Sequence, residues 1–346
     1  MRGLSNLLLL CLFGLIACVD QKSSSGSDSI LNSSLFVDDH KFIILSDSSD
    51  SDISLSGIGK IIVRDTHIYI LDNNRKHIFI YNREGKFIRQ IAQTGQAPDE
   101  YLRAIDFDIK DSCIYIYDDR NNMLQIYSTI DGSHINRIEL PFRSRAFSLL
   151  ENGDLLFAAA KESSDDQIII TGPDGEIKAR LLPFEPDDND ERLRFNILQK
   201  HRSDAIISYN RPESNDCYLL SALDGTCIRK VNLSEIANND VYFSSTPFIV
   251  NDYLIGNYVK DGVKHFYVAK DNSNSGLRAF SAPVLSLKLN GILMPLCYDE
   301  DWIISYIDFD IADALQGYDI LNADQKAHIE EGGFILSLYK LKNSTI

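Results

Sequence analysis

The sequence predicts an all-β fold: a six-bladed β-propeller made of four-stranded antiparallel sheets. Three observations lead to this prediction. Short strands of alternating apolar and polar residues recur in groups of four over about 47 residues, which is the length of a propeller blade. A tight turn containing glycine precedes the last strand of each of the first five groups. A spare strand at residues 40–45 matches the strand that the sixth group lacks.

The first five groups share one order of elements. In the first group, the alternating segments 68–72 and 77–81 are followed by Gly85 and then by the strand 87–91. Glycine supplies the positive φ that such a hairpin turn requires. The turn glycines of the five groups lie at positions 85, 132, 175, 225 and 276, between 43 and 51 residues apart. An apolar segment before each hairpin supplies the remaining strand, at residues 58–63, 104–109, 146–150, 195–198 and 247–250.

The sixth group contains three strands, at residues 292–297, 302–307 and 334–341. An unpaired sheet edge would leave backbone hydrogen-bonding groups exposed. We therefore expect residues 40–45 to pair with residues 334–341, which closes the ring and completes the last blade. A ring of five or seven blades, a twisted stack of β-meanders and a pair of β-sandwiches are the alternatives.

The amino-terminal residues have the pattern of an export signal. The nearly continuous apolar run at residues 7–16 is too short to cross about 30 Å of hydrocarbon, but it suits a secretory signal. It ends in Leu15-Ile16-Ala17-Cys18, which resembles the lipobox of bacterial lipoproteins. We therefore expect residues 1–17 to be a signal peptide and Cys18 to carry lipid, with an ordinary secretory signal as the alternative. Residues 18–39, rich in Ser and Asp, are expected to be a flexible tether before the propeller at 40–342.

Composition limits the classes of partner. The net charge of −16 would repel a phosphate backbone, so a nucleic-acid partner is not expected.

Four cysteines remain after the signal and lipidation site: Cys113, Cys217, Cys227 and Cys297. The turn at 224–225 would place Cys227 opposite Ala222 and Cys217 opposite Asn232. Cys217 and Cys227 would then lie too far apart along the paired strands to form a disulfide. We expect four buried thiols.

The pattern as a whole resembles the six-bladed β-propeller lipoproteins of Bacteroidetes, which are similar to the NHL-repeat propellers. The resemblance rests on the lipobox, on the segments Tyr-Ile-Leu-Asp72 and Tyr-Ile-Tyr-Asp118, and on Gly95-Gln-Ala-Pro-Asp-Glu-Tyr101. The last segment is similar to the family's Gly-x-Gly-Pro-Gly-Glu-Tyr, with Ala97 and Asp99 in place of glycines. The resemblance covers residues 41–342 and implies the fold, whereas most members of that family have no assigned activity. Residues 19–23 lack a dense acidic run, which favours an outer-membrane location facing either the periplasm or the exterior.

The candidate binding residues lie where long loops converge. In a propeller, the loops between blades and those between the second and third strands share one face, here residues 93–101, 143–145, 185–194 and 308–332. The candidate ligand-binding residues on this face are Arg103, Arg145, Arg194 and Asn196. For each arginine or asparagine alone, the competing interpretation is a solvated or loop-bracing side chain.

Three further segments have two interpretations each. The acidic residues 185–191 would bind Ca²⁺ weakly or form a solvated loop, and no other cofactor is predicted. Asp72 and Asp118 end equivalent strands, which favours bracing of the following turn over catalysis. The insert 308–332 has helical spacing at 311–318 and 323–329, and it is either a lid, a partner surface or a static cap over the channel.

The sequence favours a monomeric, lipid-anchored binding or scaffold module over an enzyme. A glycan, a peptide or another envelope protein is the expected partner besides the membrane. The seven histidines are scattered, and no metal-binding, nucleophile-elbow or phosphate-binding motif is present in the sequence. The alternative is a hydrolase or lyase similar to NHL or gluconolactonase propellers, with a metal site in the central channel.

Overall fold

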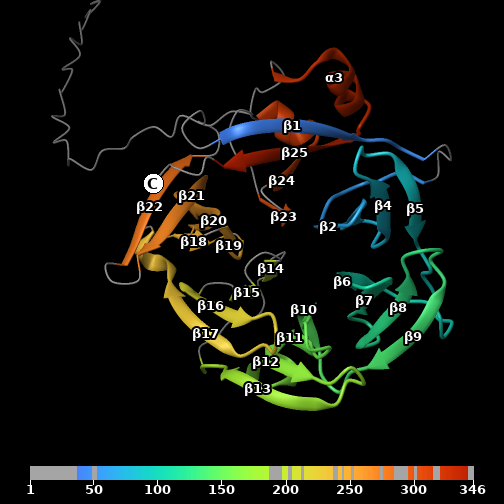
Figure 1. Cartoon of the computed structure of the whole chain (residues 1–346), viewed down its shortest axis with the longest axis vertical. Helices are drawn as coiled ribbons and strands as arrows, with labels where there is room; N and C mark the ends of the chain where they lie inside the picture. The colour runs from blue at the N-terminus through green and yellow to red at the C-terminus, as the bar shows by residue number, and fades with distance from the viewer. Residues whose placement is uncertain are drawn as a thin grey trace, which may run out of the picture. The chain divides into compact units, whose positions relative to one another are not determined.

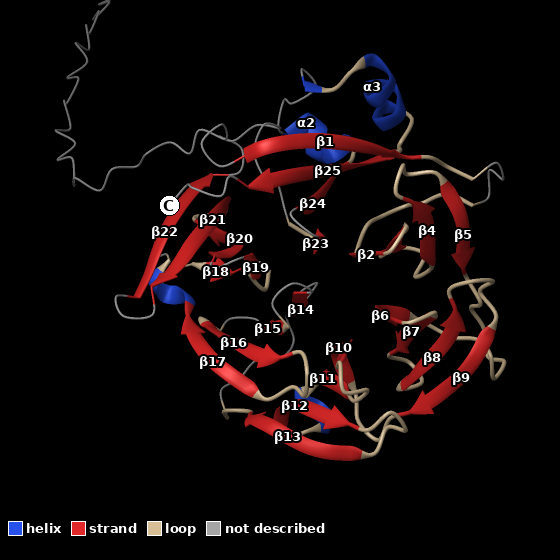
Figure 2. Ribbon diagram, viewed as in Figure 1, coloured by secondary structure: helices blue, strands red, loops and turns tan. Residues whose placement is uncertain are grey.

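The computed structural model describes residues 37–48, 53–186, 197–201, 205–211, 214–236, 241–243, 245–250, 253–272, 276–283, 295–299, 302–314 and 320–341. Within these ranges, six small antiparallel sheets are arranged around a central channel (Figure 1). Strands form nearly all of the ring's regular structure (Figure 2). The predicted six-bladed β-propeller is confirmed.

Each of the first four blades is a meander whose strands run outwards from the channel in chain order (Figure 1). Their bounds are close to those predicted from the alternating segments. The strands are β2 (Lys60–Arg64), β3 (His67–Leu71), β4 (Ile78–Asn82) and β5 (Phe87–Ile91); β6 (Ala104–Lys110), β7 (Cys113–Asp118), β8 (Met123–Ser128) and β9 (His134–Glu139); β10 (Ser144–Leu149), β11 (Leu155–Ala159), β12 (Asp166–Thr171) and β13 (Ile177–Pro183); and β14 (Leu198–His201), β15 (Ile206–Asn210), β16 (Asp216–Ser221) and β17 (Cys227–Asn232).

Blade five differs from the prediction at its inner edge. Two short strands, β18 (Tyr242–Phe243) and β19 (Phe248–Val250), pair with opposite halves of β20 (Tyr253–Lys260). The alternating pattern predicted only the second of these partners. With 8 residues, β20 is longer than the second strands of the other blades, so it has room for both. The blade continues with β21 (Val263–Asn272) and β22 (Gly276–Pro283).

Blade six is completed by a strand from the other end of the described chain. Its order from the channel is β23 (Cys297–Asp299), β24 (Trp302–Ile307), β25 (Phe334–Leu341) and β1 (Val37–Leu45). β1 pairs antiparallel with β25, with Leu45 opposite Phe334 and Val37 opposite Leu341. The ring closure predicted from the unpaired edge is thus confirmed, and β1 begins three residues earlier than expected.

The end of β1 also contacts blade one. The Ser46 amide donates to the Gly85 carbonyl at 2.9 Å, and the Phe87 amide donates to Ser46 Oγ at 3.0 Å. Gly85 has a φ of +82°, and a Cβ at this position would overlap the Ile44 carbonyl. The turn therefore needs glycine both for its backbone conformation and for its close approach to β1.

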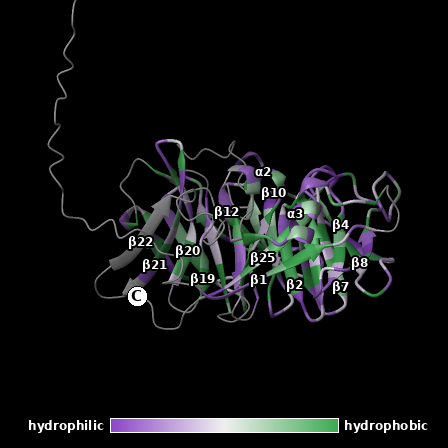
Figure 3. Ribbon diagram, turned by 90° about the horizontal axis from the view of Figure 1, so that it is seen from above, coloured by the Kyte–Doolittle hydropathy of each residue, from purple (hydrophilic) through white to green (hydrophobic). Residues whose placement is uncertain are grey.

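Apolar side chains fill the spaces between neighbouring blades. Along β2, Ile61 and Val63 pack with blade six, whereas Ile62 packs with the cluster that blade two shares. Alternate residues of an inner strand therefore face opposite neighbours. In side view, hydrophobic residues are concentrated in the strands and hydrophilic residues in the loops at both ends (Figure 3). Because residues of β2 alternate in direction, Lys60 and Arg64 face blade two, as Ile62 does.

The insert between β24 and β25 contains the two predicted helices, α2 (Phe309–Ala314) and α3 (Ala323–Glu330). The Asp308 carboxylate accepts from the Ile311 amide at 2.9 Å, and Asn322 forms a capping box with Gln325. Ala312 and Ile329 are buried against blade six. In the axial view α3 lies outside β1, at the perimeter of the ring, so it does not cover the channel (Figure 1). Among the helices that the structure describes, none has the length and apolarity needed to cross a bilayer.

Candidate functional site

The two predicted rim arginines that the structure describes are held in separate ion pairs. Arg103 binds both carboxylate oxygens of Asp119, its Nε donating to Oδ1 at 2.6 Å. This hydrogen bonding raises the pKa of the Arg103 guanidinium. Arg145 pairs with Glu162 at 3.1 Å on the corresponding loop of blade three. Each arginine thus contacts an acidic side chain of its own blade, as the loop-bracing interpretation expects, and a role in ligand binding stays a prediction. Arg194, Asn196 and Cys18 lie outside the described residues.

Asp72 and Asp118 brace their turns, as their repeated position indicated. Asp72 accepts from the Ser56 amide at 2.7 Å and from the Asn74 amide at 2.8 Å. Asp118 accepts in the same way from the Leu102 amide at 2.8 Å and from the Arg120 amide at 3.0 Å. Each carboxylate is buried and ties the loop entering its blade to the turn after the blade's second strand. Their oxygens are occupied in the fold.

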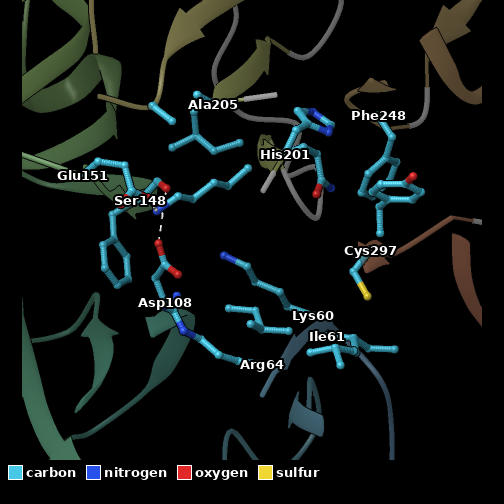
Figure 4. A pocket seen from close by; sticks show the side chains of 18 residues that line it. Lys60, Ile61, Arg64, Asp108, Ser148, Glu151, His201, Ala205, Phe248 and Cys297 are labelled. Carbon is cyan, nitrogen blue, oxygen red and sulfur yellow. Dashed lines mark hydrogen bonds and ion pairs between the residues drawn. The ribbon is translucent and has the colours of Figure 1, made fainter. Parts of the chain in front are cut away.

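A cavity of about 430 Å³ lies in the central channel, and all six blades contribute to its lining. It is lined by residues of the inner strands, of the loops that follow them and, in blade four, by Ala222 at the end of β16, not by the predicted rim arginines. Figure 4 shows its lining side chains around the open space. The lining residues are Lys60, Ile61, Ile62, Val63, Arg64, Asp108, Phe147, Ser148, Glu151, Leu198, Gln199, Lys200, His201, Ala205, Ala222, Phe248, Cys297 and Tyr298.

Two carboxylates of β6 connect blades two and three along the wall. Asp108 accepts from the amides of Ile109 at 2.7 Å and Leu149 at 2.8 Å, and from Ser148 Oγ at 3.2 Å, the contact drawn in Figure 4. Asp106 accepts from the Phe147 amide at 2.9 Å and from Lys60 Nζ at 2.6 Å. Burial raises the pKa of the Asp106 carboxyl, and Lys60 opposes this shift. These bonds hold the inner strands in one arrangement.

Basic side chains of the lining are held partly by neutral carbonyl oxygens. Arg64 Nη1 donates to the Ile109 carbonyl at 2.9 Å, which joins blades one and two. Lys200 Nζ donates to the Leu149 carbonyl at 2.6 Å and lies 3.3 Å from Glu151, whose side chain is 59% exposed. Lys60, labelled in Figure 4, is instead held by the buried carboxylate of Asp106, to which its Nζ donates at 2.6 Å. The wall therefore contains positive groups in fixed positions.

His201 and Ser208 lie within hydrogen-bond distance beside the cavity, but their geometry is not that of a nucleophile and its base. The Ile249 amide donates to His201 Nδ1 at 3.2 Å, and burial lowers the pKa of His201 to about 3, so the ring is neutral. Its proton is therefore on Nε2, which lies 3.1 Å from Ser208 Oγ. Ser208 in turn donates to the Pro247 carbonyl at 2.6 Å. The chain of donors runs away from the histidine, so His201 joins blades four and five and does not activate Ser208.

The predicted cysteine chemistry is partly confirmed. Cys217 lies opposite Val231 and Cys227 opposite Leu220, because a bulge at Leu219–Leu220 shifts the expected register. The four thiols are free. The expectation that all four are buried is wrong, since Cys227 is exposed and Cys113 is only half-buried. Cys227 begins β17, the outer strand of its blade, one face of which is in solvent.

The described residues contain no cluster of three or more His, Cys, Asp or Glu side chains that would hold a metal ion. Residues 187–191 of the predicted Ca²⁺ segment lie outside the described residues, so that prediction stays open.

The channel residues Lys60, Arg64, Lys200 and His201 were not among the site residues predicted from the sequence. A signal was present: β2 reads Lys-Ile-Ile-Val-Arg, with charged residues at both ends of an otherwise apolar inner strand. An inner strand borders only the channel and its two neighbours, so charged groups there must pair across blades or face the cavity.

Comparisons with known proteins agree with the fold. A Bacteroides fragilis protein described as exported has a solved structure that matches 90% of this chain and 96% of its own, with a TM-score of 0.71 and 18% identity. A member of the DUF4221 family from Bacteroides vulgatus matches 89% of this chain and 98% of its own, with a TM-score of 0.53 and 10% identity. No curated protein matched the chain. The family model described as "Domain of unknown function (DUF4934)" matches residues 17–338, and the chain therefore belongs to this family.

Proposed function

We propose that this protein is a binding module that takes a small polar ligand into its central channel. The observation that carries the proposal is the cavity of about 430 Å³ to which all six blades contribute. Its volume falls in the range of ligand sites, and it combines apolar walls with a few fixed polar groups. Bonds between inner strands, such as those of Asp108, hold these groups in place before a ligand arrives, which lowers the entropy cost of binding.

Among the expected partners, a glycan fits this channel better than a folded protein does. A sugar hydroxyl both donates and accepts hydrogen bonds, and the lining offers donors such as Lys60 and Arg64 beside the hydroxyl of Ser148. Tyr298 and Phe248 add aromatic surface. A single sugar, or the end of a glycan or peptide, has a size that suits the cavity.

The location that we propose follows from the amino-terminal sequence. An apolar run ending in Leu15-Ile16-Ala17-Cys18 supports export, lipidation at Cys18 and attachment to the outer membrane. The similarity to a Bacteroides fragilis protein described as exported agrees with this proposal. Metabolic labelling with a fatty-acid analogue tests it: the wild-type protein should be labelled and Cys18→Ala should not. Labelling of both proteins would contradict lipidation at Cys18.

Binding in the channel is tested by a matched pair of variants. Ile62→Trp places a large side chain into the cavity lining, whereas Ile88→Trp makes the same change on the outer strand β5, where Ile88 is exposed. Purified wild-type protein is screened against a glycan array and a small-molecule library. We expect ligands whose binding is lost in Ile62→Trp and retained in Ile88→Trp. Ligands that bind both variants equally but are lost in Arg103→Gln/Arg145→Gln would place binding at the rim instead.

A further inference from the structure

The charge of the cavity wall differs from that of the chain as a whole. The chain has a net charge of −16, yet the described cavity lining includes three cationic side chains, Lys60, Arg64 and Lys200, and two carboxylates, Asp108 and Glu151. Lys60 is paired at 2.6 Å with a third carboxylate, Asp106, which is not itself a lining residue. Charged groups inside low-dielectric walls act on a ligand more strongly than exposed ones, because water screens them less. The channel is thus a place in this acidic protein where basic groups gather.

The carboxylates near these cations are already occupied. Asp108 accepts from two amides and one hydroxyl, and Asp106 accepts from two amides and Lys60. Glu151 contacts Lys200 at 3.3 Å, but its side chain is 59% exposed, so water weakens that pair. The wall acids therefore bind the protein's own donors.

Arg64 is positioned without being neutralised by its carbonyl partner. Its Nη1 donates to the Ile109 carbonyl at 2.9 Å, and a neutral oxygen fixes the guanidinium while leaving its full positive charge. A guanidinium has five N–H donors in a planar fork that matches the oxygens of a carboxylate or phosphate. Lys200 also donates to a neutral oxygen, the Leu149 carbonyl at 2.6 Å, besides its weaker contact with the exposed Glu151.

We propose that the channel ligand carries an anionic oxygen group, a carboxylate or a phosphate, which binds to Arg64, with Lys200 adding positive charge. This inference rests on the proposed function, since it names the chemical class of ligand for the same cavity. The ligand's neutral remainder lies against the apolar part of the lining, which includes Ile62 and Phe248.

Three sugars that differ only at carbon 6 test the inference: galactose, galacturonate and galactose 6-phosphate. Calorimetric titration of the full-length wild-type protein should show at least tenfold tighter binding of one or both acidic sugars than of galactose. The tighter of the two identifies carboxylate or phosphate as the preferred group. Raising the salt concentration should weaken the acidic sugars and leave galactose unchanged.

Variants assign the effect to Arg64. Arg64→Gln should lose the preference for the acidic sugars, Arg64→Lys should keep part of it, and Lys200→Gln should reduce it independently. Arg137→Gln, which removes an exposed arginine paired with Glu139, is the matched control and should keep the preference. Circular dichroism checks that each variant keeps the β-sheet spectrum of the wild type.

Equal affinity for the three sugars, or binding of none of them, would overturn the inference of an anionic ligand. The proposed function fails separately, if no compound in the screen distinguishes Ile62→Trp from Ile88→Trp. An acidic preference that survives in Arg64→Gln and Lys200→Gln alike would also overturn the assignment to this wall.

Discussion

Lys60 on the innermost strand of blade one donates to Asp106 on the innermost strand of blade two at 2.6 Å. Similar contacts join further blades around the channel: Asp108 accepts from the Leu149 amide, and Lys200 donates to the Leu149 carbonyl. The inner strands border the cavity, so these polar contacts stabilise the ring and shape the binding wall together.

Asp108→Ala should destabilise the fold by about 2–4 kcal/mol, because it leaves the buried Leu149 amide and Ser148 hydroxyl without their acceptor. Asp108→Asn keeps one carbonyl oxygen and should cost less. Equilibrium unfolding in urea measures both. Glu84→Ala, at an exposed turn position, is the control and should stay within about 0.5 kcal/mol of the wild type. Equal stability of Asp108→Ala and Glu84→Ala would show that this bridge is unimportant.

His201 should make the protein less stable in acid. Burial lowers the pKa of His201 from 6.5 to about 3, so the unfolded chain binds a proton that the folded chain does not in this interval. Its contribution is fully present above pH 6.5 and is lost as the pH falls towards 3, by about 2 kcal/mol at pH 5. The free energy of unfolding of wild type and His201→Gln, compared between pH 7 and pH 4, measures this difference. His67→Gln, at a half-buried position, is the control. Parallel pH profiles for wild type and His201→Gln would contradict the prediction.

Substitution of two turn glycines tests whether β1 packs against blade one and so closes the ring. Gly85 and Gly132 occupy the same turn in successive blades, with φ of +82° and +76°. Gly132→Ala should cost about 1 kcal/mol for its backbone conformation, because its Cβ would meet only Ile91 at 3.9 Å. Gly85→Ala should cost about 2–4 kcal/mol, since its Cβ would also displace the Ile44 carbonyl of β1. Equal Tm shifts for the two variants would mean that β1 does not press on this turn.

The four described cysteines should react in the order of their exposure. Iodoacetamide should alkylate the exposed Cys227 first and the half-buried Cys113 more slowly. Cys217 and Cys297 should react only after unfolding, because burial raises the pKa of both thiols. Peptide mass spectrometry of samples taken over time measures the order. Early alkylation of Cys217 or Cys297 in native buffer would contradict the described burial.

The ring was predictable because strand alternation and turn glycines are local signals, and because the unpaired edge at 334–341 required a partner. The cavity was not predictable in the same way. Whether Arg64 faces a neighbouring blade or solvent depends on Ile109 on the next blade, 45 residues away. The sequence likewise could not show which partner Arg103 contacts, because its pairing with Asp119 depends on how the adjacent turn folds. The strand β18 was missed because two residues are too few to show alternation.

The most direct test of the central claim is a crystal structure of the protein with the tightest ligand from the screen. We predict ligand density inside the channel, between Arg64 and Phe248. Density on the face that carries Arg103 and Arg145, with an empty channel, would contradict it.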